Sequence, residues 1–181
     1  MNNTRKLTTM ALLAAVSVAL VALIHFPLIP AAPFLEYDPA DIPILICGFA
    51  FGVPAGLAVT LIASVIQGLT VSAASGIYGI IMHVIATGTY VTVTGLIYRR
   101  KPSKKTAAIA IAAGIISMAA IMIPANLLIT PLFTGWPVKS VANLLLPGII
   151  PFNLAKAGIN GAITFVVYKG ISKLIKMFHA K

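Results

Sequence analysis

The sequence predicts an all-α integral membrane protein with six transmembrane helices. Of its 181 residues, 60% are hydrophobic and only 9% are charged, and the mean hydropathy is +1.05. Soluble domains carry roughly 25% charged residues, whereas about 20 apolar residues make one membrane span. The chain therefore has material for roughly six spans and little for a soluble domain. We expect residues 1–181 to form a single transmembrane domain.

The composition also excludes several classes of protein. One cysteine excludes a disulfide scaffold. The chain contains no GxxxxGK[ST], GxSxG, HExxH or CxxC pattern, so we expect no ATPase, no hydrolase and no metal site. A net charge of +10 indicates nucleic acid in a soluble protein, but in a membrane protein it is typical of cytoplasmic loops. We therefore expect membrane lipid around the chain and no nucleic-acid partner.

The first apolar run covers about residues 10–29, after Arg5 and Lys6. It resembles a signal peptide at its charged end, and Ala31–Ala32 resembles a cleavage site. The run is longer than the roughly 7–15 apolar residues of a signal peptide, and Pro33 follows the site directly. We therefore expect a retained first span.

A proline-rich loop follows the first span. Proline removes a backbone donor and disfavours helix in the residue before it, so the loop should be extended and ordered; its prolines, with one just beyond it, are Pro27, Pro30, Pro33, Pro39 and Pro43. Helix should resume over Asp41–Phe51, about 16 Å long and too short for a hydrocarbon core of about 30 Å. Such irregular backbone is tolerated at membrane depth only where protein or water satisfies it. The sequence therefore predicts a cavity under this loop.

The remaining elements follow from breaks in the apolar pattern. The turn FGVPAG at 51–56 precedes a third span to about residue 71, and small residues at 72–76 form a second outer turn. The basic segment RRKPSKK at 99–105 separates the fourth and fifth spans, at about 77–98 and 106–130. A longer connection at 131–147 leads to the last helix, at about 148–177.

The basic residues predict the orientation of these spans. Eleven of the thirteen lie on the side of the termini: Arg5, Lys6, five within 99–105, Lys169, Lys173, Lys176 and Lys181. Only Lys139 and Lys156 lie toward the other side. Because cytoplasmic loops are enriched in Lys and Arg, both termini should be cytoplasmic, with the proline-rich loop and the Trp136 loop outside.

Polar residues within spans need partners and so mark candidate sites. Asn153, Lys156 and Asn160 share one face of the last helix, because they are three and four residues apart. Asn126 follows Pro124, which should bend the fifth span. Lys156 either extends outward along the helix or faces a pocket. Two amides and one ammonium under the outer loop suit a neutral polar heterocycle, because amides match an imide edge.

All three acids, Glu36, Asp38 and Asp41, fall within the proline-rich loop or at its end. Asp41, before Ile42–Pro43, is a good helix N-cap. Asp38 caps a turn, or else Glu36 or Asp38 pairs with Lys156. The neighbouring residues form an apolar lid or stacking face: Phe34, Leu35 and Tyr37.

Two other residues have structural or functional interpretations. His83, alone in the fourth span, is a packed, hydrogen-bonded histidine or a ligand contact, and Cys47 is a small buried apolar residue. Ala11, Ala15 and Ala19 repeat every four residues, a spacing that lets helices approach closely in membranes.

Three motifs together resemble a known family: FLEYDPADIP, FGVPAG and PFNLAKAGINGAITFVVYK. They are similar to the riboflavin-specific S component (RibU type) of energy-coupling factor (ECF) transporters. The resemblance covers nearly the whole chain. It implies a substrate-binding subunit of the cell membrane without its own ATPase or cofactor. The resemblance implies that this subunit would take riboflavin, with FMN as an alternative, and would dock on a transmembrane coupling protein with two cytoplasmic ATPases.

The resemblance also assigns residues by position. Ala11 and Ala15 would contact the coupling protein, and Leu35, Asn126, Asn153 and Lys156 would contact the flavin. With the candidates from the outer loop and the fourth span added, the candidate ligand contacts are Leu35, Tyr37, Asp38, Gly79, His83, Asn126, Asn153 and Lys156. The fourth span departs from the family pattern, because Ile80 and His83 stand where members often carry Glu and Asn. The other interpretations are an S component for another vitamin or heterocycle, an intramembrane enzyme, and a channel-like subunit.

Overall fold

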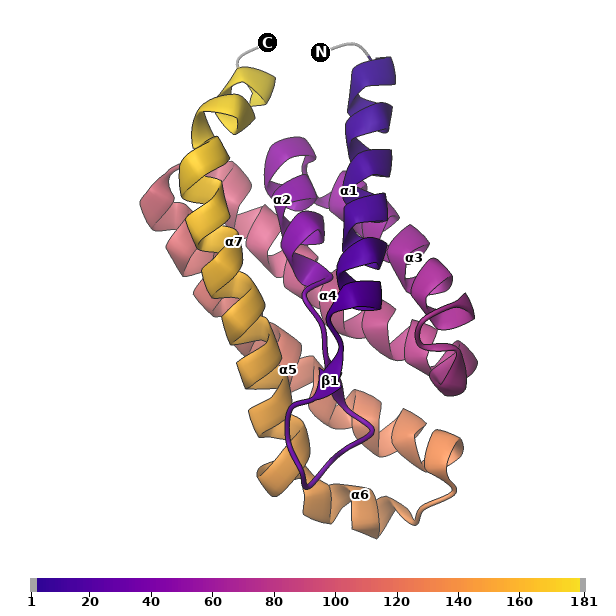
Figure 1. Ribbon diagram of the computed structural model, residues 1–181. Coiled ribbons are helices and arrows are strands. Elements are labelled where there is room, and N and C mark those ends of the chain that lie inside the picture. The colour runs from indigo at the N-terminus through magenta and orange to yellow at the C-terminus, as the bar shows by residue number, and fades with distance from the viewer. Residues whose placement is uncertain (1–2, 180–181) are drawn as a thin grey trace.

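The computed structural model describes residues 3–179, without the side chains of residue 169 and of residues from 171 onward. It is a bundle of helices with one small ribbon of strands (Figure 1). In chain order the elements are α1 (Asn3–Leu23), β1 (Phe26–Pro27), β2 (Glu36–Tyr37), α2 (Asp41–Phe51), α3 (Val53–Leu69), the 3-10 turn η1 (Ala73–Ser75), α4 (Gly76–Arg100), α5 (Lys104–Thr134), α6 (Val138–Leu144), the π-helical turn η2 (Leu145–Ile149) and α7 (Ile150–His179).

Four of the described helical segments are long and apolar enough to cross a membrane. They are Asn3–Leu23, Ala73–Arg100, Lys104–Thr134 and Val138–Tyr168. The helices α2 and α3 are apolar but shorter. For α2 the predicted bounds match the observed ones. Residues 37–40 of the preceding loop are buried, whereas much of the rest of the loop is exposed.

The first helix lies earlier in the sequence than predicted. It covers Asn3–Leu23 instead of residues 10–29. Pro27 disfavours helix at Phe26, and residues 26–27 instead form β1, which pairs antiparallel with β2. Phe26 lies opposite Tyr37 in this ribbon, with ring centroids 5.3 Å apart. Strand pairing therefore holds part of the proline-rich loop in place. The proline pattern in the sequence did not predict this pairing.

The connection predicted at 131–147 is wrong, because most of it is helical. Helix α5 continues through Pro131 to Thr134 and ends at Gly135, whose φ of 72° is readily adopted only by glycine. After a three-residue turn, α6 and the π-helical turn η2 lead directly into α7. A proline inside an apolar helix bends it without ending it when neighbouring helices hold the chain.

The N-cap role predicted for Asp41 is also wrong. Ala40 occupies the N-cap position of α2 and makes no side-chain capping bond. Asp41 lies in the first turn and is fully buried. Its carboxylate accepts hydrogen bonds from Thr87 on α4 and Asn160 on α7. A capping bond would have used the same oxygens.

Contacts between helices define the two ends of the molecule. The Tyr98 and Tyr168 hydroxyls lie 2.6 Å apart, which places the end of α4 beside the C-terminal half of α7. The start of α1 and the end of α7 lie toward this end in Figure 1, and α6 and the loop that follows β1 lie at the opposite end. The basic side chains Lys169, Lys173 and Lys176, and all of Lys181, lie outside the described residues.

Tyr90 of α4 anchors the centre of the bundle. The Tyr90 ring occupies the space that a Cβ at Gly114 would need, and its hydroxyl occupies the space that a Cβ at Gly161 would need. The hydroxyl donates to the Ala157 carbonyl at 3.0 Å. The two glycines therefore let α5 and α7 approach α4 closely, and this fixes the position of the polar face of α7.

Candidate functional site

A cavity opens beneath the proline-rich loop, between α3, α4, α5 and α7. It holds about 1050 Å³ of empty space, part of which is open to solvent. Most of its wall is apolar: Val21, Phe34, Leu35, Tyr78, Met82, Met118, Met122, Ile129, Phe133 and Phe152. Such a cavity, apolar with a few placed polar groups, is typical of small-molecule sites.

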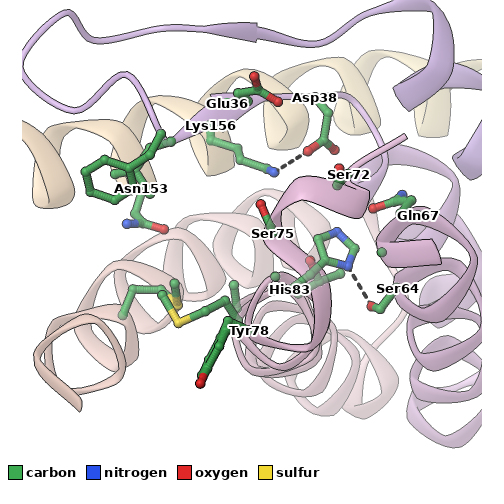
Figure 2. A pocket seen from close by; sticks show the side chains of 18 of the residues that line it. Glu36, Asp38, Ser64, Gln67, Ser72, Ser75, Tyr78, His83, Asn153 and Lys156 are labelled. Carbon is green, nitrogen blue, oxygen red and sulfur yellow. Dashed lines mark hydrogen bonds and ion pairs between the residues drawn. The ribbon is translucent and has the colours of Figure 1, made fainter. Parts of the chain in front are cut away.

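An ion pair joins the loop to α7 at the cavity wall. Lys156 Nζ donates to Asp38 Oδ2 at 2.6 Å (Figure 2). Burial disfavours the charged carboxyl, but Lys156 and the Ala40 N–H outweigh this and hold the pKa of Asp38 below its ordinary value. Lys156 is only 7% exposed. It therefore faces the cavity instead of extending outward, and Asp38 both pairs with it and caps the turn at Ala40.

Asn160 ties the same loop to α7 one turn further on. Its Nδ2 donates to the Asp38 carbonyl and to Asp41 Oδ2, each at 2.9 Å, and its Oδ1 accepts from the Tyr37 hydroxyl at 3.0 Å. Neither Asn160 nor Tyr37 lines the cavity. The prediction that Tyr37 forms part of the lid over the pocket is therefore wrong, because its ring is buried and its hydroxyl is turned toward α7.

Two amides stand on the cavity wall, one from α5 and one from α7, and each lies two residues after a proline. Asn126 Nδ2 donates to the Met122 carbonyl and Asn153 Nδ2 to the Ile149 carbonyl, each at 2.8 Å. Thr130 donates to Asn126 Oδ1 at 2.9 Å. Each amide nitrogen has a second N–H, so these bonds fix the side chains while leaving donor capacity toward the cavity.

A second polar group of residues lies where α3, η1 and α4 meet. His83 Nδ1 lies 2.7 Å from Ser64 Oγ, so His83 is hydrogen-bonded and also lines the cavity. Gly79 is needed here because a Cβ would collide with that of Ser75 in η1. Gln67, on the same face of α3 as Ser64, was not among the predicted residues. In the sequence, what could have pointed to Gln67 is that it is a single amide within an apolar span.

The structure thus brings together seven of the eight predicted ligand contacts in one cavity: Leu35, Asp38, Gly79, His83, Asn126, Asn153 and Lys156. The remaining residue, Tyr37, does not line the cavity, and its hydroxyl bonds the loop to Asn160 on α7. Ala11 and Ala15 are exposed on α1 and do not line the cavity.

The chain is similar in sequence to known proteins along most of its length. Over 97% of its length the chain is 28% identical to Riboflavin transporter RibU of Streptococcus thermophilus, of which the match covers 86%. It is 28% identical over 91% of its length to Riboflavin transporter FmnP of Bacillus subtilis, of which 88% is covered. It is 26% identical over 97% of its length to Riboflavin transporter RibU of Staphylococcus aureus, of which 95% is covered.

A solved structure of the S component of a bacterial ECF transporter has the same fold. Its TM-score is 0.84 at 26% identity, covering 97% of this chain and 99% of that one. The family model for the substrate-specific component of ECF transporters matches residues 5–168. These are transporter subunits and not enzymes. The chain belongs to the family of substrate-specific components of ECF transporters.

Proposed function

We propose that this chain captures riboflavin from outside the cell and, docked on an ECF module, delivers it inward. The observation that carries the proposal is the convergence of Asn126, Asn153 and Lys156 on one apolar cavity. The names of the relatives, which are riboflavin transporters, support the choice of ligand.

The chemistry of riboflavin suits this cavity. Its flat ring system would pack on apolar side chains such as Met118, Met122 and Phe152. Its imide edge both donates and accepts hydrogen bonds, as an asparagine amide does. Because riboflavin is neutral, Lys156 would act as a hydrogen-bond donor with its charge balanced by Asp38. FMN would use that charge more directly.

We propose six spans, with α2 and α3 counted beside the four longer segments, and both termini in the cytoplasm. The basic residues at 99–105 support this orientation, because they adjoin the end of the bundle marked by Tyr98 and Tyr168. The proline-rich loop and the cavity would then face outward in the cell membrane.

We also propose that α1 docks on the coupling protein of the ECF module. Ala11, Ala15 and Ala19 are exposed along one face of α1, whereas Ala14 and Ser17 are buried against the bundle. Small side chains allow another helix to approach closely. Ala15→Trp should leave riboflavin binding intact and abolish co-purification with the ATPases. Co-purification at normal yield would remove this face from the interface.

Fluorescence titration tests the ligand. Purified protein should quench riboflavin fluorescence at submicromolar concentrations, and Lys156→Ala or Asn126→Ala should weaken binding at least tenfold, or about 1.4 kcal/mol. Lys139→Ala and Asn143→Ala are matched controls, because both residues are exposed and lie outside the cavity lining. Absence of quenching in wild type, or tighter binding of another vitamin in a competition panel, would contradict riboflavin as the substrate.

A further inference from the structure

One end of the cavity carries polar groups that the proposed ring contacts do not use. This polar corner is formed by Ser64, Gln67, Ser72, Ser75 and His83, from α3, α4 and the turn between them that contains η1. Figure 2 shows Gln67, Ser64 and His83 on the side of the cavity opposite Asn153. The corner is therefore separate from the amide on α7.

Hydrogen bonding determines which nitrogen of His83 carries its proton. The Ser64 hydroxyl donates its only proton to the Thr60 carbonyl at 2.6 Å. The contact of 2.7 Å between Ser64 Oγ and His83 Nδ1 therefore has Nδ1–H as its donor. In the neutral ring, Nε2 then carries the lone pair and is an acceptor.

That acceptor has no partner within the described part of the chain. His83 Nε2 is buried without a hydrogen bond, and the nearest carboxylate oxygen, Asp41 Oδ1, is 3.9 Å away. Hydrogen bonds from Thr87 and Asn160 already engage Asp41. The lone pair of His83 is therefore available to a group that donates.

Gln67 supplies the complementary donor. Its side chain is 5% exposed, and its Nε2 has no hydrogen-bond partner among the described residues. It lies three residues after Ser64, the partner of His83, and so on the same face of α3 and on the wall of the same cavity. Buried amides are nearly always hydrogen-bonded in proteins. We therefore expect the Gln67 amide to donate a hydrogen bond to a ligand in the cavity.

A donor from α3 and an acceptor from α4 on the wall of one cavity match hydroxyl groups, each of which accepts one hydrogen bond and donates another. A phosphate would place only acceptors against the His83 lone pair, and an apolar group would leave both partners unsatisfied. The Ser72 and Ser75 side chains extend the polar lining. We propose that Gln67 and His83 recognise the hydroxyl-bearing tail of the ligand and determine specificity for it.

This inference rests on the proposed function, because it assigns the ribityl chain of riboflavin to the polar corner. A site that hydrogen-bonds a substrate hydroxyl discriminates strongly against the analogue lacking it. The suitable analogue is lumiflavin, which has the same ring with a methyl group in place of the ribityl chain. Its binding reports on the ring contacts alone.

The experiment titrates riboflavin and lumiflavin against wild type, Gln67→Leu, Gln67→Met and His83→Phe. Wild type should prefer riboflavin at least tenfold. Each variant should lose at least tenfold in riboflavin affinity and keep its lumiflavin affinity, which also shows that the protein is folded. Lys156→Ala is the contrasting control and should weaken both ligands by the same factor.

The outcomes separate this inference from the proposed function. The inference is wrong if wild type binds both flavins equally, or if the Gln67 and His83 variants weaken the binding of both in parallel. In either case the polar corner does not recognise the tail, but the proposal that the protein binds riboflavin stands. If wild type binds neither flavin, the proposed function is wrong and the inference falls with it.

Discussion

Two buried polar regions adjoin the cavity and differ in how their groups are paired. In the loop–α7 network, Asp38, Asp41 and Asn160 bond to residues up to 123 positions away. In the polar corner, Gln67 Nε2 and His83 Nε2 have no partner among the described residues. Paired groups stabilise the fold, whereas unpaired ones reduce its stability and remain available to a ligand. This difference distinguishes the loop–α7 network, which stabilises the site, from the polar corner, which we propose recognises the substrate.

The largest effect on stability should come from breaking the ion pair. Asp38→Ala leaves the Lys156 ammonium without its 2.6 Å partner in a buried position, so the free energy of unfolding of the ligand-free protein should fall by about 3 kcal/mol. Thermal unfolding in detergent would measure this. Glu36→Ala is the matched control, because Glu36 is exposed. Equal melting temperatures for both variants would show that the ion pair does not stabilise the loop.

A smaller loss is expected from Asn160→Leu. The change removes three hydrogen bonds and leaves the Tyr37 hydroxyl unpaired, so the free energy of unfolding should fall by about 2 kcal/mol. Riboflavin affinity should fall as well, because the loop over the cavity loses its anchor. Asn143→Leu, on the exposed face of α6, should change neither quantity. A variant with wild-type stability would mean that the ion pair alone anchors the loop.

The smallest effect on stability should come from the polar corner. Gln67→Met removes a buried amide whose Nε2 has no described partner, so the ligand-free protein should unfold within about 0.5 kcal/mol of wild type, or be slightly more stable. The same melting experiment measures this. A loss as large as that of Asn160→Leu would show that Gln67 supports the fold, and the contrast between the two regions would disappear.

Local patterns predicted much of this molecule. The bounds of α2 and the shared face of Asn153, Lys156 and Asn160 follow from helical spacing and proline chemistry, which act over a few residues. The prediction for Asp41 was wrong because a local rule, helix capping, competed with distant partners on α4 and α7. Pro131 likewise remained within α5, although proline commonly ends a helix.

The sequence by itself determined that the chain is apolar and helical, with an extended loop before a short helix, because hydropathy and backbone preference are properties of neighbouring residues. Only the tertiary structure decided which acid meets Lys156, that Tyr37 turns away from the cavity, and that Gln67 and His83 lie together. These pairings join residues from separate helices. They depend on how closely the helices approach, which positions such as Gly114 and Gly161 allow.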